Sequence, residues 1–472
     1  MPEALAARIE TIRKTPFISN AAWHAGNRPT SLKVPRIGEG IRVLFWNIER
    51  GLNLDSIKLM FRDPKAFLEK SDVKSAGETA DLAEQIEDLR KADILILNEL
   101  DWGMKRTGYR EVVRELGEAL GMNWAYAVEF FEIDPVNLGT ETFPEGEAEE
   151  SAKLQEMLRV DKEKFRGIHG TAILSRYPIR SARSDPFEYQ AYDWYRSEKA
   201  KRSAPEKGKR IVAEKVFLET ILREVRRGGR TTLTVTLDVA GSPDGRITVV
   251  SPHLENRCKP DKRRRQMREI LDRIKDADHT VILAGDLNTS MSDAAPTTIK
   301  REIYKRVGSA EFWASRGLKW ATGIGLAYDI AVGSVNKIKN LNDPTAKHVP
   351  IVAPNPESGF FEVMEKFRFA DGGLWDFRGD AARARGKMGT LANSNERGEK
   401  GFVATYAVTR TIGPVGQFKL DWIFVKVSPG NGYRMSPHFP RVYKDLNYSY
   451  MERVSDHNPI SVDLPFGEAA LN

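Results

Sequence analysis

The chain has 472 residues, 41% of them hydrophobic, and a formal net charge of +7 at pH 7. A chain of this length can bury a sizeable core, and since no window approaches about 18 apolar residues, a transmembrane helix is excluded. The single cysteine, Cys258, excludes an intrachain disulfide, and Met1–Leu5 lacks the pattern of a signal peptide. We therefore expect a cytoplasmic protein without stable membrane association.

Residues 1–38 are predicted to be an N-terminal extension, and the main domain is expected to span residues 39–466. Its first strand is the apolar run Ile41–Trp46. The elements expected after it, in chain order, are helix Thr79–Lys91, strand Ala92–Leu97, helix Tyr109–Leu120, strands Gly170–Arg176, Arg230–Val239 and Arg246–Val250, helix Lys262–Lys275, and strands Thr280–Ala284, Lys419–Val425 and Pro459–Val462. This alternation of strands and helices indicates a layered α/β fold.

Three variable segments interrupt the pattern, at about 131–167, 184–223 and 290–368, and residues 467–472 form a C-terminal tail. The second of them combines aromatic residues with a basic run. Its cations Arg196, Lys199, Lys201 and Arg202 follow Tyr189, Tyr192, Trp194 and Tyr195. Such a segment suits stacking on bases and contact with phosphates, although a solvated loop explains the same composition.

Polar motifs follow the apolar runs, where ligand sites of layered α/β folds gather. Asn47 and Glu49 alternate with Ile48, so both are expected on one strand face. The other motif residues are Glu99, His253, Asp286, Asn288, Asp421, Asp456 and His457. Oxygen ligands combined with two imidazoles suit metal-assisted phosphoester hydrolysis.

This ordered set, from about Arg42 to Leu464, resembles the endonuclease/exonuclease/phosphatase superfamily. The resemblance implies a four-layer α/β sandwich, in which two packed, mixed, mainly antiparallel β-sheets are flanked by helices. His253 resembles the histidine of the deoxyribonuclease I, sphingomyelinase and deadenylase branch. The abasic-site branch has a tyrosine there. The inositol 5-phosphatase branch is disfavoured, because Leu420-Asp421-Trp422 replaces its Trp-Cys-Asp-Arg signature.

The resemblance also implies roles for the motif residues. Glu99 becomes the principal Mg²⁺ ligand, with Mn²⁺ as a substitute, and Glu49, Asn47 and Asp456 lie on the metal side. Asp286 orients the attacking water, while Asn47 and Asn288 contact the phosphate. His253 and His457 act on the phosphate or the leaving oxygen, and Asp421 orients His457. His169 is expected to have a supporting or structural role.

The favoured substrate is nucleic acid, on the basic balance of the chain and the commonest activity of the superfamily. The alternatives are a phospholipid, as in sphingomyelinases, and a small phosphoester. A non-catalytic binding scaffold is disfavoured, because all the motif residues are present.

Overall fold

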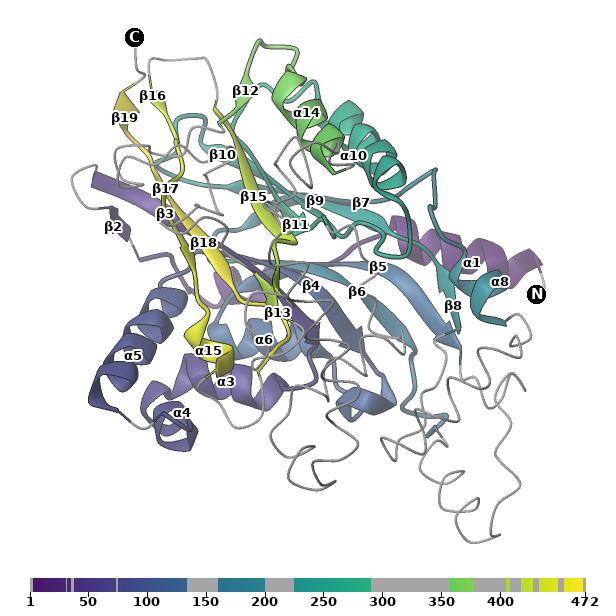
Figure 1. The fold of residues 1–472 in the computed structure, drawn as a ribbon, viewed down its shortest axis with the longest axis horizontal. Helices are drawn as coiled ribbons and strands as arrows, with labels where there is room; N and C mark the ends of the chain where they lie inside the picture. The colour runs from purple at the N-terminus through teal and green to yellow at the C-terminus, as the bar shows by residue number, and fades with distance from the viewer. Residues whose placement is uncertain are drawn as a thin grey trace, which may run out of the picture.

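Two stacked β-sheets with helices on both outer faces make up the protein in the computed structural model (Figure 1). The structure describes residues 3–30, 32–34, 38–73, 75–133, 160–199, 225–289, 357–376, 405–407, 417–427, 433–448 and 454–469. This arrangement confirms the predicted four-layer sandwich of two mixed, mainly antiparallel sheets.

The larger sheet has nine strands in the order β1-β5-β6-β4-β3-β18-β17, with β2 added to β3 and β8 to β5. The pairing of β3 with β4 is parallel, and the others are antiparallel. The strand bounds are β1 (Phe17–Ser19), β2 (Leu32–Val34), β3 (Gly38–Arg50), β4 (Ile94–Trp102), β5 (Asn123–Ile133), β6 (Ile168–Ser175), β8 (Val225–Gly228), β17 (His438–Val442) and β18 (Ile460–Pro465).

The second sheet has six strands in the order β12-β15-β11-β10-β9-β7, and only β10 and β11 run parallel. Its strands are β7 (Ile179–Pro186), β9 (Thr231–Asp238), β10 (Arg246–Pro252), β11 (Val281–Asp286), β12 (Leu374–Trp375) and β15 (Asp421–Val427). Two short ribbons pair β13 (Tyr406–Ala407) with β14 (Gln417–Phe418) and β16 (Tyr433–Arg434) with β19 (Glu468–Ala469).

Helices cover the outer faces of the two sheets (Figure 1). They are α1 (Glu3–Lys14), α2 (Ala21–His24), α3 (Leu54–Arg62), α4 (Pro64–Lys70), α5 (Ala76–Arg90), α6 (Val112–Leu120), α8 (Trp194–Lys199), α10 (Pro260–Ile274), α14 (Ser358–Lys366) and α15 (Asp445–Tyr448), with the 3₁₀ turn η1 (Lys105–Thr107). Helices α3 to α6 pack on the nine-stranded sheet, and α10 and α14 pack on the six-stranded sheet.

The central strands are apolar on both faces because each face meets another layer. In β3, Val43 and Phe45 join the core between the sheets, whereas Leu44 and Trp46 join the core under the helices. This double burial explains why these strands appear in the sequence as continuous apolar runs. Within the described residues, no helix is long and apolar enough to span a bilayer.

The N-terminal segment is built into the sandwich. Strand β1 pairs with β5, and Arg13 of α1 is buried, donating to the carbonyl oxygen of Gly229 at 3.1 Å while Ser184 donates to its backbone carbonyl. Of the variable segments, 184–199 is described and contains α8, whereas 200–224 and 290–356 lie outside the described residues.

Candidate active site

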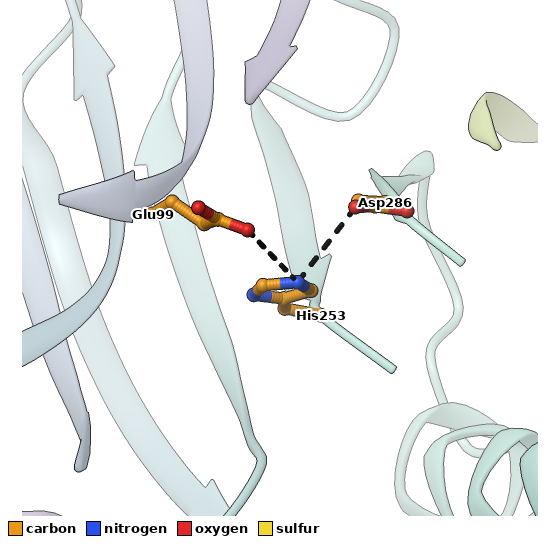
Figure 2. A group of neighbouring side chains, drawn as sticks. All are labelled: Glu99, His253 and Asp286. Atoms are coloured by element: carbon orange, nitrogen blue, oxygen red, sulfur yellow. Dashed lines mark ion pairs between the residues drawn. The ribbon is translucent and has the colours of Figure 1, made fainter. Parts of the chain in front are cut away.

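Three side chains from three strands approach one another closely. Glu99 lies on β4, Asp286 ends β11, and His253 follows β10. Nε2 of His253 lies 3.9 Å from Oε1 of Glu99 and 3.7 Å from Oδ2 of Asp286 (Figure 2). A parallel backbone bridge also joins His253 to Asp286. None of these side chains is more than 14% exposed, so water screens their charges only weakly.

The Asn47 amide links the two carboxylates of this cluster. Its Nδ2 donates to Oε1 of Glu99 and to Oδ2 of Asp286, at 3.2 Å in each case. Burial raises the pKa of Glu99, but the side chains of His253 and Arg50 more than offset burial and hold the pKa well below its ordinary value. The ionised Glu99 therefore offers a hard oxygen ligand beside a second carboxylate, which fits a divalent cation such as Mg²⁺.

His457 enters the same cluster from the loop before β18. Its Nδ1 lies 2.8 Å from Oδ2 of Asp421, and its Nε2 lies 3.8 Å from Oδ2 of Asp286. Burial lowers the pKa of His457, but the nearby carboxylates of Asp421 and Asp286 outweigh burial and raise it. The imidazolium form is thus favoured, and its Nε2–H can serve as a donor in the site.

Three motif residues have a left-handed backbone, with φ of 47° at Glu49, 57° at Glu99 and 49° at Asn288. The simple alternation expected at Asn47–Glu49 and Asp286–Asn288 is therefore broken. In both motifs the first side chain accepts the backbone N–H of the residue two positions later, at 3.1 and 2.9 Å. Each such turn bends the chain away from the strand. Left-handed non-glycine residues cost about 1–2 kcal/mol each and gather at functional sites.

Buried amides and hydroxyls hold the strand ends in place. The Asn98 side chain accepts the backbone N–H of Asp286 at 2.9 Å and donates to Thr171 and Ser251 at 2.7 and 3.2 Å. Asn98 and Ser251 lie within the motif segments, so their position beside Glu99 and His253 is the signal that could have found them. Ser455 likewise donates to the carbonyl oxygen of Asn47 at 2.6 Å and ties the His457 loop to β3.

Glycine is required just before Asp286. A Cβ at Gly285 would lie 2.0 Å from the carbonyl oxygen of Pro252. Only glycine therefore allows β11 to approach β10 this closely.

Two predicted metal-side residues lie outside the closest grouping. Among the described residues, the acidic and imidazole side chains whose ligand atoms come within 4.8 Å of one another form two groups, Glu99–His253–Asp286 and Asp286–Asp421–His457. Neither group contains Glu49, which is half-buried, or Asp456, which is buried. Their metal-side role stays a prediction.

His169 and Asn288 have direct protein contacts. Nδ1 of His169 lies 2.9 Å from Asp101, whose carboxylate also accepts from Arg106. His169 thus takes part in a buried ion-pair network. The amide of Asn288 donates to the carbonyl oxygen of Leu254 at 2.9 Å, which places it next to His253 in the chain.

Helix α8 of the second variable segment lies beside β8 (Figure 1). Its Trp194 is 3% exposed and donates to Oε2 of Glu255 at 3.0 Å, so its ring faces are not available for stacking on bases. Arg196 and Lys199 are exposed on α8, whereas Lys201 and Arg202 lie outside the described residues.

Two buried residues that the sequence analysis missed face the far side of His253. Arg230 lies 2.7 Å and Glu129 lies 3.4 Å from its Nδ1. Glu129 interrupts the apolar β5 sequence Ala127-Val128-Glu129-Phe130. A charged residue in a buried strand is the signal that could have found it.

A two-sheet α/β sandwich whose strand ends bring carboxylates, an amide and imidazoles together defines a metal-dependent phosphoester hydrolase. The sequence matches the Endonuclease/Exonuclease/phosphatase family over residues 44–457, and the chain belongs to this family. It is therefore an enzyme of that class. No curated protein matches the sequence.

Solved structures are similar to this chain at low identity. An endonuclease/exonuclease/phosphatase from Beutenbergia cavernae DSM 12333 has 15% identity and a TM-score of 0.41, covering 92% of this chain and 73% of that chain. D. rerio TDP2, complexed with single strand DNA product, has 15% identity and a TM-score of 0.36, with 90% and 98% covered. The human Nocturnin catalytic domain has 14% identity and a TM-score of 0.34, with 96% and 97% covered. Scores this low carry no argument about substrate.

Proposed function

We propose that this protein is a Mg²⁺-dependent phosphodiesterase that hydrolyses nucleic acid by in-line attack of a water molecule. The observation that carries the proposal is the contact of the Asp286 carboxylate with both the Asn47 amide and His457, at 3.2 and 3.8 Å. One carboxylate thereby faces both a polar group on the metal side and an acid–base group.

Glu99 would hold the cation, with Asn47 beside it and with Glu49 and Asp456 on the same side. These oxygen donors fit Mg²⁺, with Mn²⁺ as the substitute, better than Zn²⁺. The bound cation would neutralise charge on the phosphoryl oxygens.

The remaining groups would act on water and phosphate. Asp286 accepts a hydrogen bond from the water and orients it for attack. His457 is held by Asp421 and donates from Nε2 to a phosphoryl oxygen or to the leaving oxygen. Asn288 and His253 contribute further polar contacts to the phosphate.

Nucleic acid is favoured over other phosphodiesters on charge. The chain carries a formal net charge of +7, and Arg196 and Lys199 present exposed cations on α8. Lys201 and Arg202 follow in sequence and complete the proposed contact with the polymer backbone.

The test is a turnover assay on single-stranded DNA, RNA, sphingomyelin vesicles and bis-p-nitrophenyl phosphate. Each substrate is assayed with Mg²⁺, with Mn²⁺ and with EDTA. Metal-dependent cleavage of DNA or RNA supports the proposal. Cleavage of only the lipid or only the small diester would contradict the substrate assignment, and no turnover of any substrate would contradict the reaction. Asp286→Asn should abolish activity, and Asp278→Asn, the same change at an exposed position, is the matched control.

A further inference from the structure

The side chain of Arg230 contacts the face of His253 that points away from the Glu99–Asp286 cluster. Nη1 of Arg230 lies 2.7 Å from Nδ1 of His253, and the Arg230 side chain is only 3% exposed. Two carboxylates balance the buried guanidinium. Oε2 of Glu129 lies 3.2 Å from Nη1, and Oε2 of Glu255 lies 3.6 Å from Nε.

This contact determines which nitrogen of His253 carries the proton. A guanidinium donates hydrogen bonds and accepts none. A nitrogen 2.7 Å from Nη1 must therefore be an acceptor, because two N–H groups facing each other at that distance would repel. Glu129 also approaches Nδ1, but at 3.4 Å, and its carboxylate is already bonded to Arg230. The acceptor role at Nδ1 leaves the proton on Nε2.

We propose that Arg230 is a positioning residue that fixes His253 as the neutral imidazole with its proton on Nε2, so that His253 donates a hydrogen bond to a phosphoryl oxygen. In this tautomer Nε2 has no free lone pair. His253 is then not a metal ligand, although it lies within reach of Glu99 and Asp286, and it does not relay protons. The proposal deepens the proposed function and rests on it for the identity of the phosphate.

The two histidines of the site consequently have opposite tautomers. Asp421 accepts a hydrogen bond, so Nδ1 of His457 carries a proton, and its Nε2 can gain and release a second one. Arg230 donates a hydrogen bond, so Nδ1 of His253 carries no proton. One imidazole is equipped for proton transfer and the other for donation alone.

The second variable segment supports this arrangement. Oε2 of Glu255 accepts the indole N–H of Trp194 at 3.0 Å, and its backbone N–H donates to Gln266 of α10 at 3.1 Å. Helix α8 thus helps to fix the carboxylate that balances Arg230, which gives this part of the segment a role besides binding substrate.

The tautomer can be measured directly on the full chain labelled with ¹⁵N-histidine. Long-range ¹H–¹⁵N spectra distinguish a protonated Nε2 from a protonated Nδ1, and the His253→Ala spectrum assigns the signal. We expect Nε2–H in the wild type and a mixture of tautomers in Arg230→Gln, because glutamine can either donate or accept. Arg230→Lys should restore the wild-type signal. A protonated Nδ1 of His253 in the wild type would overturn the proposal whether or not the protein has phosphodiesterase activity.

Substitutions at the two histidines provide a second test that does not require Arg230 variants to fold. A glutamine amide replaces an Nε2–H donor but cannot transfer protons. His253→Gln should keep at least tenfold more kcat than His253→Ala on bis-p-nitrophenyl phosphate, whereas His457→Gln should be no better than His457→Ala. Equal loss in both His253 variants would contradict the donor role.

A double-mutant cycle tests whether Arg230 acts through His253. Arg230→Gln should lower kcat in the wild type by about tenfold or more and change it less than threefold in the His253→Ala background. Fully additive losses would show that Arg230 acts elsewhere. An inactive wild type would contradict the proposed function and leave the spectroscopic test intact.

Discussion

Oδ2 of Asp421 lies 2.8 Å from Nδ1 of His457, and both side chains are buried. The carboxylate fixes the ring orientation and holds a proton on Nδ1, which leaves Nε2 directed to within 3.8 Å of Asp286. The strand β15 begins at Asp421 and pairs with β11, and their register places Asp421 opposite Asp286. The sheet itself therefore brings the orienting carboxylate, the imidazole and the water-binding carboxylate together.

Replacing Asp421 should damage catalysis through His457. We expect Asp421→Asn to lower kcat by on the order of 10²-fold or more, because an asparagine amide can turn its N–H toward Nδ1 and invert the tautomer. The measurement is kcat on bis-p-nitrophenyl phosphate. In a His457→Ala background the same substitution should have little further effect, and an undiminished loss there would separate Asp421 from His457.

Glu99 is the predicted principal metal ligand, so Glu99→Gln should weaken cation binding and abolish most activity. Mg²⁺ and Mn²⁺ affinity is measured by calorimetry, which does not depend on turnover. The matched comparison is His457→Ala, which should lose activity but keep cation affinity. Wild-type affinity in Glu99→Gln would end the assignment of Glu99 as a ligand.

The sequence predicted the central strands and the motif residues well because both follow from local pattern. The apolar runs Ile41–Trp46 and Thr280–Ala284 became β3 and β11, and the helix expected at Thr79–Lys91 became α5. The site residues of β4, β10 and β11 come together because parallel neighbours end at the same edge. Helix α3 was missed, although Leu54, Ile57 and Met60 recur at helical spacing.

What local pattern could not predict depends on contacts between distant segments. Arg230 and Glu129 meet His253 only through pairing in the folded sheets, and nothing near them in sequence marks a site. The left-handed turn at Glu49 overrides the alternation of β3, because the Asn47 side chain captures a backbone N–H. Trp194 had the composition of a stacking residue, yet the fold buries it against Glu255.

A buried carboxylate away from the site should make the stability of the fold depend on pH. Burial raises the pKa of Asp93 to about 7, despite the backbone N–H of Arg42 and the charge of Arg176, which lower it. The folded chain therefore holds a proton that the unfolded chain releases near pH 4. The contribution to stability is present below about pH 4 and declines as the pH rises to about 7. The loss is on the order of 4 kcal/mol.

Asp93→Asn should remove this pH dependence, because an amide stays neutral and its oxygen can still accept the Arg42 N–H. The free energy of unfolding, measured in urea, should exceed that of the wild type at pH 8 and change little relative to it at pH 4. Asp72→Asn, at an exposed position, is the control. A wild-type pH profile in Asp93→Asn would refute the assignment.

The exposed cations of α8 should contribute to nucleic-acid binding through phosphate contacts. Arg196 and Lys199 are exposed, and the printed partners of both side chains lie on or next to α8, at Asp193 and Tyr195. Reversing both charges in Arg196→Glu/Lys199→Glu should weaken binding of single-stranded DNA or RNA. Each lost contact should lower the slope of log K against log salt by about 0.7, or about 1.4 for two contacts.

Turnover of bis-p-nitrophenyl phosphate should be unchanged in this double variant, because the small diester needs no contact with α8. Trp194→Phe is the structural comparison. It removes the hydrogen bond to Glu255 without altering charge, so it should lower stability and leave the salt slope intact. Wild-type affinity and slope in the charge-reversal variant would show that α8 takes no part in substrate binding. The nucleic-acid assignment would then depend on direct turnover of DNA or RNA alone.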